Sequence, residues 1–122
     1  MIIVDTSVWI DHLKAGDARL VELLGRGRVL AHPFVTGELA LGSLHQRAAV
    51  LGALNDLPQA LVAREDEVMT FIEAQKLFGT GIGYVDAHLL TAARLTPGVT
   101  LWTRDRRLRE ASARLQLAAD LT

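Results

Sequence analysis

The chain has 122 residues, of which 50% are hydrophobic and 22% charged, and its 13 Lys and Arg against 14 Asp and Glu give a net charge of −1. This length suits one core, so we predict a single domain over residues 1–122. The absence of cysteine excludes disulfides, thiol nucleophiles and Cys-ligated metal centres. The near-neutral charge argues against non-specific nucleic-acid binding over the whole surface, but it leaves room for a local basic patch.

No apolar run approaches the ~18 residues that a membrane span needs, so we expect no membrane association and a cytoplasmic protein. Met1 leads directly into the apolar run Ile2–Val4, with no positively charged stretch before it. We therefore expect the fold to begin there and interpret the segment as a strand, not as a signal peptide.

Short apolar runs alternate with longer segments in which apolar residues recur at i, i+3 and i+4. The short runs predict buried strands, because they are too short for helices and too apolar for a sheet with one wet face. This alternation predicts an α/β fold with a mostly parallel sheet of about five strands and helices on both faces. The predicted strands are residues 2–4, 29–31, 61–63, 99–102 and 117–119, and helices are predicted from near Ser7, over 20–25 after an N-cap at Asp17, and over 35–44, 65–77, 84–95 and 105–115.

Two acidic residues, Asp5 and Asp105, directly follow predicted strands. Asp5 ends the run Ile2–Val4, and Asp105 closes the triplet Thr103–Asp105 after the run at 99–102. In open α/β sheets the carboxyl ends of the strands are where ligands bind. Capping of the following helix is the alternative for each carboxylate.

Two further acids, Glu38 and Asp86, lie within predicted helices. Their neighbours at i−4, i−3, i+3 and i+4 are apolar residues or glycine. We therefore expect both carboxylates on the apolar faces of their helices, where an acid has to be paired, neutralised or bound to a metal. A structural salt bridge to an arginine is the alternative.

A convergence of these four carboxylates predicts a metal site. Four anions within a few ångströms of each other cannot all stay ionised without a counter-charge. Ligation by oxygen alone favours Mg²⁺ or Mn²⁺ over zinc or copper. The four histidines show neither metal-ligand spacing nor a nearby cysteine, so we expect them at the surface or beside the acids; they are His12, His32, His45 and His88.

Four segments of the chain resemble the PIN-domain ribonucleases, and most closely the VapC toxins of bacterial toxin–antitoxin pairs. They are IIVDTSVWIDHL (2–13), PFVTGELALGSL (33–44), GTGIGYVDAHLLTAARL (79–95) and LWTRDRRL (101–108). They occur in the family's order and at family-like spacing, and together they cover essentially the whole chain. The family's four acidic positions fall on Asp5, Glu38, Asp86 and Asp105.

The resemblance implies a PIN-like three-layer sandwich and a metal-dependent endoribonuclease that hydrolyses RNA phosphodiester bonds to arrest translation or growth. It implies that Thr6 and Thr103 occupy hydroxyl positions that orient carboxylates or phosphate. It further implies a homodimer and a small cognate antitoxin as partner. The alternatives are a PIN-fold RNA-processing nuclease without an antitoxin and a catalytically silent module that binds RNA or protein.

An arginine-rich segment beside Asp105 is the candidate RNA-binding surface. Arg104, Arg106 and Arg107, together with Arg109, have guanidinium groups that suit phosphate recognition. A solvated helix face is the alternative. Because the chain is slightly acidic, we expect recognition of a structured RNA such as tRNA or rRNA by its shape.

Several large apolar residues have two interpretations. For Trp9 and Trp102 we favour core packing over base stacking, whereas Tyr84 remains a stacking candidate. A second group either faces another subunit or belongs to the core, and its members are Leu51, Leu54, Phe71 and Phe78.

Other activities fit the motifs poorly. A haloacid-dehalogenase-type phosphatase needs a second Asp where this chain has Ser7, and a response-regulator receiver needs an acidic pair and a late Lys. The glycines at 79, 81 and 83 follow a predicted helix instead of a strand and lack a lysine, so they do not match a nucleotide-binding loop.

Overall fold

The computed structural model describes residues 1–121. Three parallel strands form a sheet in the order β2-β1-β3: β1 (Ile2–Val4), β2 (Val29–Leu30) and β3 (Thr100–Trp102). The helices are α1 (Thr6–Ala15), α2 (Ala18–Gly25), α3 (Pro33–Ala40), α4 (Arg47–Asp56), α5 (Glu65–Ala74), α6 (Tyr84–Leu95) and α7 (Arg106–Arg114).

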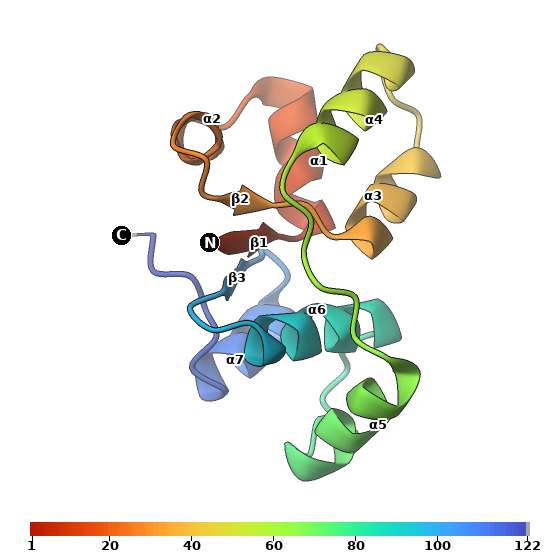
Figure 1. The fold of residues 1–122 in the computed structure, drawn as a ribbon, viewed down its shortest axis with the longest axis vertical. Helices are drawn as coiled ribbons and strands as arrows, with labels where there is room; N and C mark the ends of the chain where they lie inside the picture. Colours follow the sequence, from red (N-terminus) through yellow and green to blue (C-terminus); the bar gives the residue numbers. More distant parts are fainter. Residues whose placement is uncertain (122) are drawn as a thin grey trace.

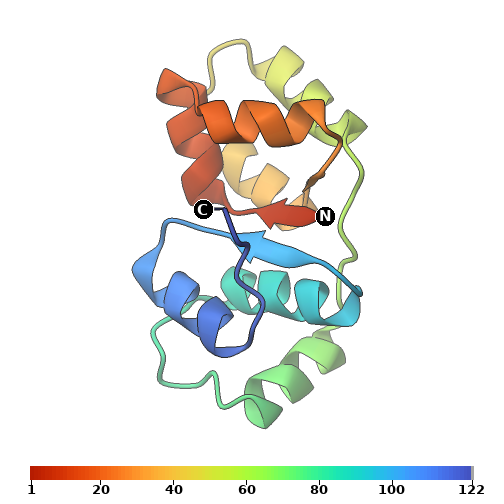
Figure 2. The same ribbon diagram turned by 90° about the vertical axis from the view of Figure 1, so that its left-hand side faces the viewer.

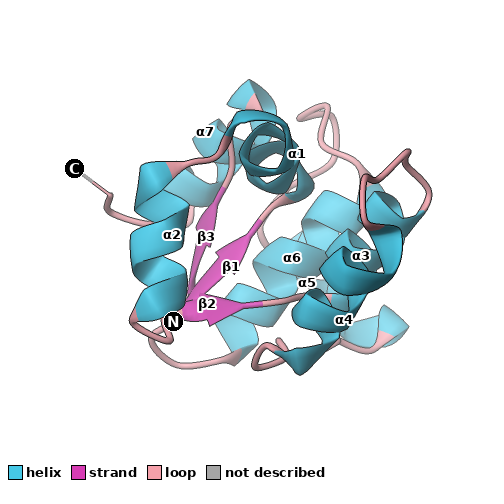
Figure 3. Ribbon diagram, turned by 90° about the horizontal axis from the view of Figure 1, so that it is seen from above, coloured by secondary structure: helices cyan, strands magenta, loops and turns pink. Residues whose placement is uncertain are grey.

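The helices form a layer on each side of the sheet. Helices α1 to α4 lie on one side and α5 to α7 on the other (Figures 1 and 2). Seen from above, the three strands lie side by side between these layers (Figure 3). The predicted α/β class, with a parallel sheet between helices, is confirmed.

The sheet has three strands where about five were predicted. A single β-bridge extends it at each edge, from Ala31 to Gln59 and from Leu101 to Ala118. The predicted strand at 117–119 is therefore reduced to one bridge. The predicted strand at 61–63 is wrong, because the pairing with Ala31 falls two residues earlier in the chain.

The physical reason for the misplaced strand is exposure. Leu61 and Val62 are 48% and 42% exposed, so this apolar run is not drawn into the core. The backbone instead pairs through the N–H of Ala31, which donates to the carbonyl of Pro58, and the N–H of Ala60, which donates to the carbonyl of Ala31.

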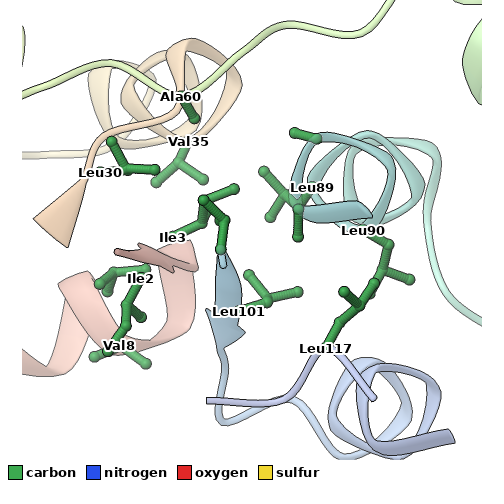
Figure 4. Packing of buried hydrophobic residues seen from close by; sticks show 14 of the residues in the cluster. Ile2, Ile3, Val8, Leu30, Val35, Ala60, Leu89, Leu90, Leu101 and Leu117 are labelled. Atoms are coloured by element: carbon green, nitrogen blue, oxygen red, sulfur yellow. The ribbon is translucent and has the colours of Figure 1, made fainter. Parts of the chain in front are cut away.

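The core surrounds β1, whose three residues are all buried. Val8 of α1 packs against the sheet from one side, and Leu89 and Leu90 of α6 pack from the other (Figure 4). Burying side chains of this kind contributes roughly 1.5–3 kcal/mol each. Burial on both faces explains why β1 is an unbroken apolar run without polar alternation.

Helix boundaries follow the predicted signals in most places. The N–H of Leu20 donates to Oδ1 of Asp17 at 2.9 Å, which confirms Asp17 as the N-cap of α2. Pro33 opens α3 as predicted, but α3 ends at Ala40 and not at Leu44. The apolar side chain that was to continue the helix, Leu41, is 90% exposed and so supplies no packing energy there.

The large apolar residues divide between core and surface. Trp9 is buried, as predicted, whereas Trp102 is half-buried. Leu54 and Phe71 belong to the core, and Leu51 is partly buried against it. Phe78 is 61% exposed. In residues 1–121 no helix has the length and apolar character to cross a bilayer.

Of the histidines expected at the surface or beside the acids, His32 and His88 are not at the surface, since both are buried. His32 precedes α3, and its Nδ1 accepts the N–H of Phe34 at 3.0 Å, so it caps the helix. Burial, with a smaller effect from His88, lowers the pKa of His32 to about 4. The core therefore holds this imidazole in its neutral form.

Acidification should destabilise the fold through His32. The unfolded chain binds a proton at His32 near pH 6.5, whereas the folded chain resists protonation down to about pH 4. Between these values the unfolded state binds more protons, so the free energy of unfolding falls as the pH falls, by up to about 3 kcal/mol. The variant His32→Asn keeps an acceptor for the helix N-terminus. It should show a flatter pH dependence in urea unfolding between pH 7 and pH 4; an unchanged slope would contradict this account.

Candidate active site

The candidate site lies where β1 and β3 end. These strands are parallel neighbours, and the final pair in their register is Val4 with Trp102. The next residue after β1, Asp5, donates its N–H to the carbonyl of Trp102 at 2.9 Å. Asp5 and Thr103 therefore lie side by side at the carboxyl edge of the sheet, and both are buried.

Two hydroxyl groups hold the carboxylate of Asp5. Oδ2 accepts hydrogen bonds from Oγ1 of Thr103 at 2.7 Å and from Oγ of Ser7 at 2.9 Å. Asp5 occupies the N-cap position of α1, but its side chain makes no capping hydrogen bond. Helix capping therefore does not explain this side chain.

Glu38 differs from its predicted environment. It lies on α3 and is exposed, so its expected position on an apolar face is wrong. Two of the neighbours that defined that face, Leu41 and Gly42, lie beyond the end of the helix and are exposed. Oγ1 of Thr6 donates to Oε1 of Glu38 at 2.7 Å, which fixes the carboxylate beside the start of α1.

Asp86 lies in the first turn of α6 and is half-buried. Its Oδ2 accepts the N–H of Gly83 at 3.0 Å. Burial raises the pKa of Asp86, the Gly83 hydrogen bond opposes this, and the charges of Asp5, Asp105 and Glu38 raise it further. The other three acids singled out in the sequence therefore lie close enough to Asp86 for their charges to affect it.

Asp105 has a structural task as well as its place in this cluster. Its Oδ1 accepts the N–H of Leu108 at 2.9 Å and caps α7, so the capping interpretation holds for this residue. Its own N–H donates to Oγ1 of Thr103 at 3.1 Å. The capping bond uses Oδ1, and Oδ2 is left for another ligand.

The four acids do not form a closed metal cage. Within residues 1–121 no group of three or more His, Cys, Asp or Glu side chains is arranged to hold an ion by itself. The donors are oxygen atoms only, and burial together with the charges of the other three acids raises the pKa of Asp86. Such a set fits a hydrated Mg²⁺ or Mn²⁺, because Mg²⁺ keeps several waters and takes only one or two carboxylates directly.

The arginines beside Asp105 have different surroundings. Arg104 forms salt bridges with Asp11 and Asp17, and its guanidinium lies over the ring of Trp102. Arg106 pairs with Glu110 at 3.7 Å.

Arg107 lies across the loop that precedes α6. A Cβ atom at Gly81 would come within 2.7 Å of Nη1 of Arg107, so a side chain at this position would displace the guanidinium. Gly81 also has a φ of +85°, which disfavours other residues. Among the described residues, Arg107 has no carboxylate partner.

Two residues of this region were missed in the sequence. Ser7 served there to mark the start of a helix and to exclude a phosphatase, and its contact with Asp5 was not predicted. Its place two residues after a strand-end acid was the available signal. Asp11 was not considered, and only the folded chain brings it to Arg104, which is 93 residues away.

An apolar groove adjoins the site. This cavity, of about 440 Å³, lies between α1 and the segment that follows α3. Glu38 forms part of its wall, so the groove and the acidic cluster share a side chain. Apolar lining comes from Ile10, Leu13, Leu39 and Leu44, and Lys14 and His45 add polar groups.

Comparisons with known proteins agree with one another. The family model described as PIN domain matches residues 2–114. Proteins named Ribonuclease VapC32 from two strains of Mycobacterium tuberculosis are 54% identical over 113 residues, which cover 93% of this chain and 91% of theirs. The crystal structure of PAE2754 from Pyrobaculum aerophilum matches with a TM-score of 0.59 and 20% identity, over 91% of this chain and 78% of that one. At this identity the last match concerns the fold alone.

Replacement of Asp86 by Asn should stabilise the metal-free chain. It removes one of four repelling charges, and the amide oxygen still accepts from Gly83. Because the folded-state pKa of Asp86 is raised, the gain should be absent below its ordinary pKa of 3.8 and grow as the pH rises. We expect the Tm in EDTA at pH 7 to rise by a few degrees.

Asp66→Asn is the matched control. Asp66 is exposed on α5, and the hydrogen bond from Arg64 lowers its pKa, so its charge is favourable. Its removal should not raise the Tm. An equal rise in both variants would show that general charge reduction, and not the acidic cluster, is responsible.

Proposed function

The chain belongs to the PIN-domain family, and from this premise we propose that it is a metal-dependent endoribonuclease, the toxin component of a toxin–antitoxin system. It hydrolyses RNA phosphodiester bonds and so arrests translation or growth. The observation that carries the proposal is that Asp5, Glu38 and Asp105 lie close enough to Asp86 for their charges, in addition to burial, to raise its pKa. The repulsion within such a cluster destabilises the fold unless a bound cation neutralises it.

We propose that these four carboxylates hold Mg²⁺ or Mn²⁺. When bound, the ion supplies charge neutralisation at the phosphate and lowers the pKa of a water molecule. Thr6 orients Glu38, and Thr103 orients Asp5. This division leaves the threonines to fix geometry and the carboxylates to bind the ion.

Asp86 and Asp105 are the candidates for accepting the proton of the attacking water. Each carboxylate gives one oxygen to a backbone N–H, of Gly83 and Leu108 respectively, and keeps the other. The hydrogen-bonded oxygen fixes the group, and the remaining oxygen can hold a proton during the reaction.

The RNA is proposed to follow the start of α7. Arg107 has the clearest case, because its guanidinium lies against Gly81 and has no carboxylate partner among residues 1–121. Arg106 is exposed beside it, and its pairing with Glu110 on the surface is weak. Arg104 was predicted in the same group, but its salt bridges leave it the weakest case. A structured RNA such as tRNA or rRNA, recognised by shape, fits these few contacts.

We further propose that the chain forms one domain over residues 1–122, that two copies associate as a homodimer, and that the protein is cytoplasmic. Thr122 lies outside the described residues. We also propose that a small antitoxin binds the apolar groove beside α1. An occupant there would reach Glu38 and exclude RNA from the acids.

Cleavage of end-labelled total cellular RNA tests the activity. We expect discrete products that require Mg²⁺ or Mn²⁺ and disappear with EDTA. Asp5→Asn should lower the rate by more than about 100-fold, because changes around metal ligands alone cost 10–100-fold. Asp66→Asn, on the far helix α5, should cut as the wild type does.

Two outcomes would overturn this proposal. Equal cutting by wild type and Asp5→Asn would assign the activity to a contaminant. Binding of RNA by both proteins without cleavage by either would favour the catalytically silent module.

A groove variant tests the antitoxin. Leu13 is partly exposed in the groove, and Leu13→Glu should weaken inhibition by the product of a neighbouring short reading frame by at least about tenfold, since it places a charge on the apolar contact. RNA cleavage without the partner should stay unchanged. Val21→Glu, on the exposed side of α2, is the control. Equal inhibition of Leu13→Glu and wild type would exclude this groove, and the lack of any inhibitory partner would favour an RNA-processing nuclease.

A further inference from the structure

The two hydroxyls that bind Asp5 have their protons directed by the backbone. The N–H of Arg104 donates to Oγ of Ser7 at 3.0 Å, and the N–H of Asp105 donates to Oγ1 of Thr103 at 3.1 Å. A backbone N–H can only donate, so each hydroxyl oxygen acts as acceptor there. Each hydroxyl proton is thereby free to point to the carboxylate.

Both hydroxyl protons meet on the same oxygen. Oδ2 of Asp5 receives Thr103 at 2.7 Å and Ser7 at 2.9 Å. This fork occupies Oδ2 and leaves Oδ1 of Asp5 as the oxygen that can serve as a ligand. The orientation of Asp5 therefore depends on where the loop at 103–105 lies relative to α1.

Arg104 sets that position. Its Nη1 donates to Oδ2 of Asp11 at 2.6 Å, and its Nη2 donates to Oδ2 of Asp17. Ser7 and Asp11 are four residues apart on α1 and so lie on one face, one turn from each other. The backbone N–H of Arg104 binds Ser7, and its guanidinium binds Asp11. Asp17 adds a contact at the start of α2, and Trp102 lies against the guanidinium.

The charges at Arg104 are unsuited to a phosphate. One guanidinium faces two carboxylates, so this group of three side chains carries a net negative charge. Both Nη groups of Arg104, which a bidentate phosphate contact would use, are already bound to carboxylates, one to Asp11 and one to Asp17. An RNA strand would have to displace Asp11 or Asp17 to use them.

We propose that Arg104 is a positioning residue for Asp5, acting through Ser7, and not an RNA contact. Its side chain fastens the loop after β3 to α1, so that Ser7 and Thr103 together present Oδ1 of Asp5 to a divalent cation. This inference rests on the proposed function only in taking that cation as the ligand.

Mn²⁺ binding to the full chain tests the inference without any cleavage assay. Free Mn²⁺ is measured by electron paramagnetic resonance during titration of the protein. We expect Arg104→Gln to raise the Kd for Mn²⁺ by about tenfold, within the range that residues behind metal ligands produce. The Kd of Arg104→Lys should lie between those of the wild type and Arg104→Gln, because one ammonium group cannot bridge two carboxylates as a guanidinium does.

Arg64→Gln is the matched control. Arg64 also contacts two acids, Asp66 and Glu67, but on the exposed surface of α5. Its loss should leave the Kd for Mn²⁺ unchanged. Circular dichroism and the Tm establish that each variant is folded.

RNA binding in EDTA separates the two interpretations of Arg104. The probe is a short RNA hairpin, and the measured quantity is the slope of log K against log salt, which reports the number of phosphate contacts. Arg107→Gln should reduce the magnitude of this slope by about the amount that one phosphate contact contributes, and it should leave the Kd for Mn²⁺ unchanged. Arg104→Gln should leave this slope unchanged and raise the Kd for Mn²⁺.

The outcomes that overturn the inference are distinct. An unchanged Mn²⁺ Kd in Arg104→Gln, beside binding by the wild type, overturns it alone. Failure of the wild type to bind Mn²⁺ overturns the proposed metal dependence and the inference with it. If Arg104→Gln does not fold, Ser7→Ala decides, because it removes one arm of the fork and leaves the salt bridges; wild-type Mn²⁺ affinity in Ser7→Ala contradicts the proposal.

Discussion

The parallel pairing of β1 with β3 is the constraint on which the site depends. The pairing ends with Val4 beside Trp102, and the next residues on the two strands are Asp5 and Thr103. A shift of this register by one residue would turn the side chains of a strand to the opposite face and separate the carboxylate from its hydroxyl partner. The apolar residues of β1, buried between two helical layers, keep the register in place. The packing of the core therefore also fixes the geometry of the site.

The acidic cluster works against this stability. Burial raises the pKa of Asp86, and the charges of Asp5, Asp105 and Glu38 raise it further, which is a cost of folding without a cation. The fold bears this cost by giving each acid a fixed hydrogen-bond donor: a backbone N–H for Asp86 and Asp105, and a hydroxyl for Asp5 and Glu38. The repulsion is thus held in a defined geometry that a divalent ion can relieve.

The sequence predicted the parts of this structure that depend on local patterns. The buried strands at 2–4 and 99–102 and the cap at Asp17 follow from apolar runs and capping chemistry, and the structure contains them. Exposure defeated the predictions for 61–63 and for Glu38, since an apolar run does not reveal whether anything packs on it. Arg104 shows a different limit. Its salt-bridge partners Asp11 and Asp17 are far away in the chain, so only the folded structure distinguishes a clamp from a basic patch.

The separation of the fork's partners along the chain has a consequence for synthesis. Asp5 is bound by Thr103, 98 residues later, and Ser7 is bound by Arg104, 97 residues later. Because a chain emerges from the ribosome with its N-terminus first, Asp5 is made well before the residues that set the geometry of its carboxylate. Until β3 and the loop after it have emerged from the ribosome, the carboxylate of Asp5 is not oriented. Translation itself therefore delays the assembly of the site until the loop at 103–105 has been made and can pair with the start of α1.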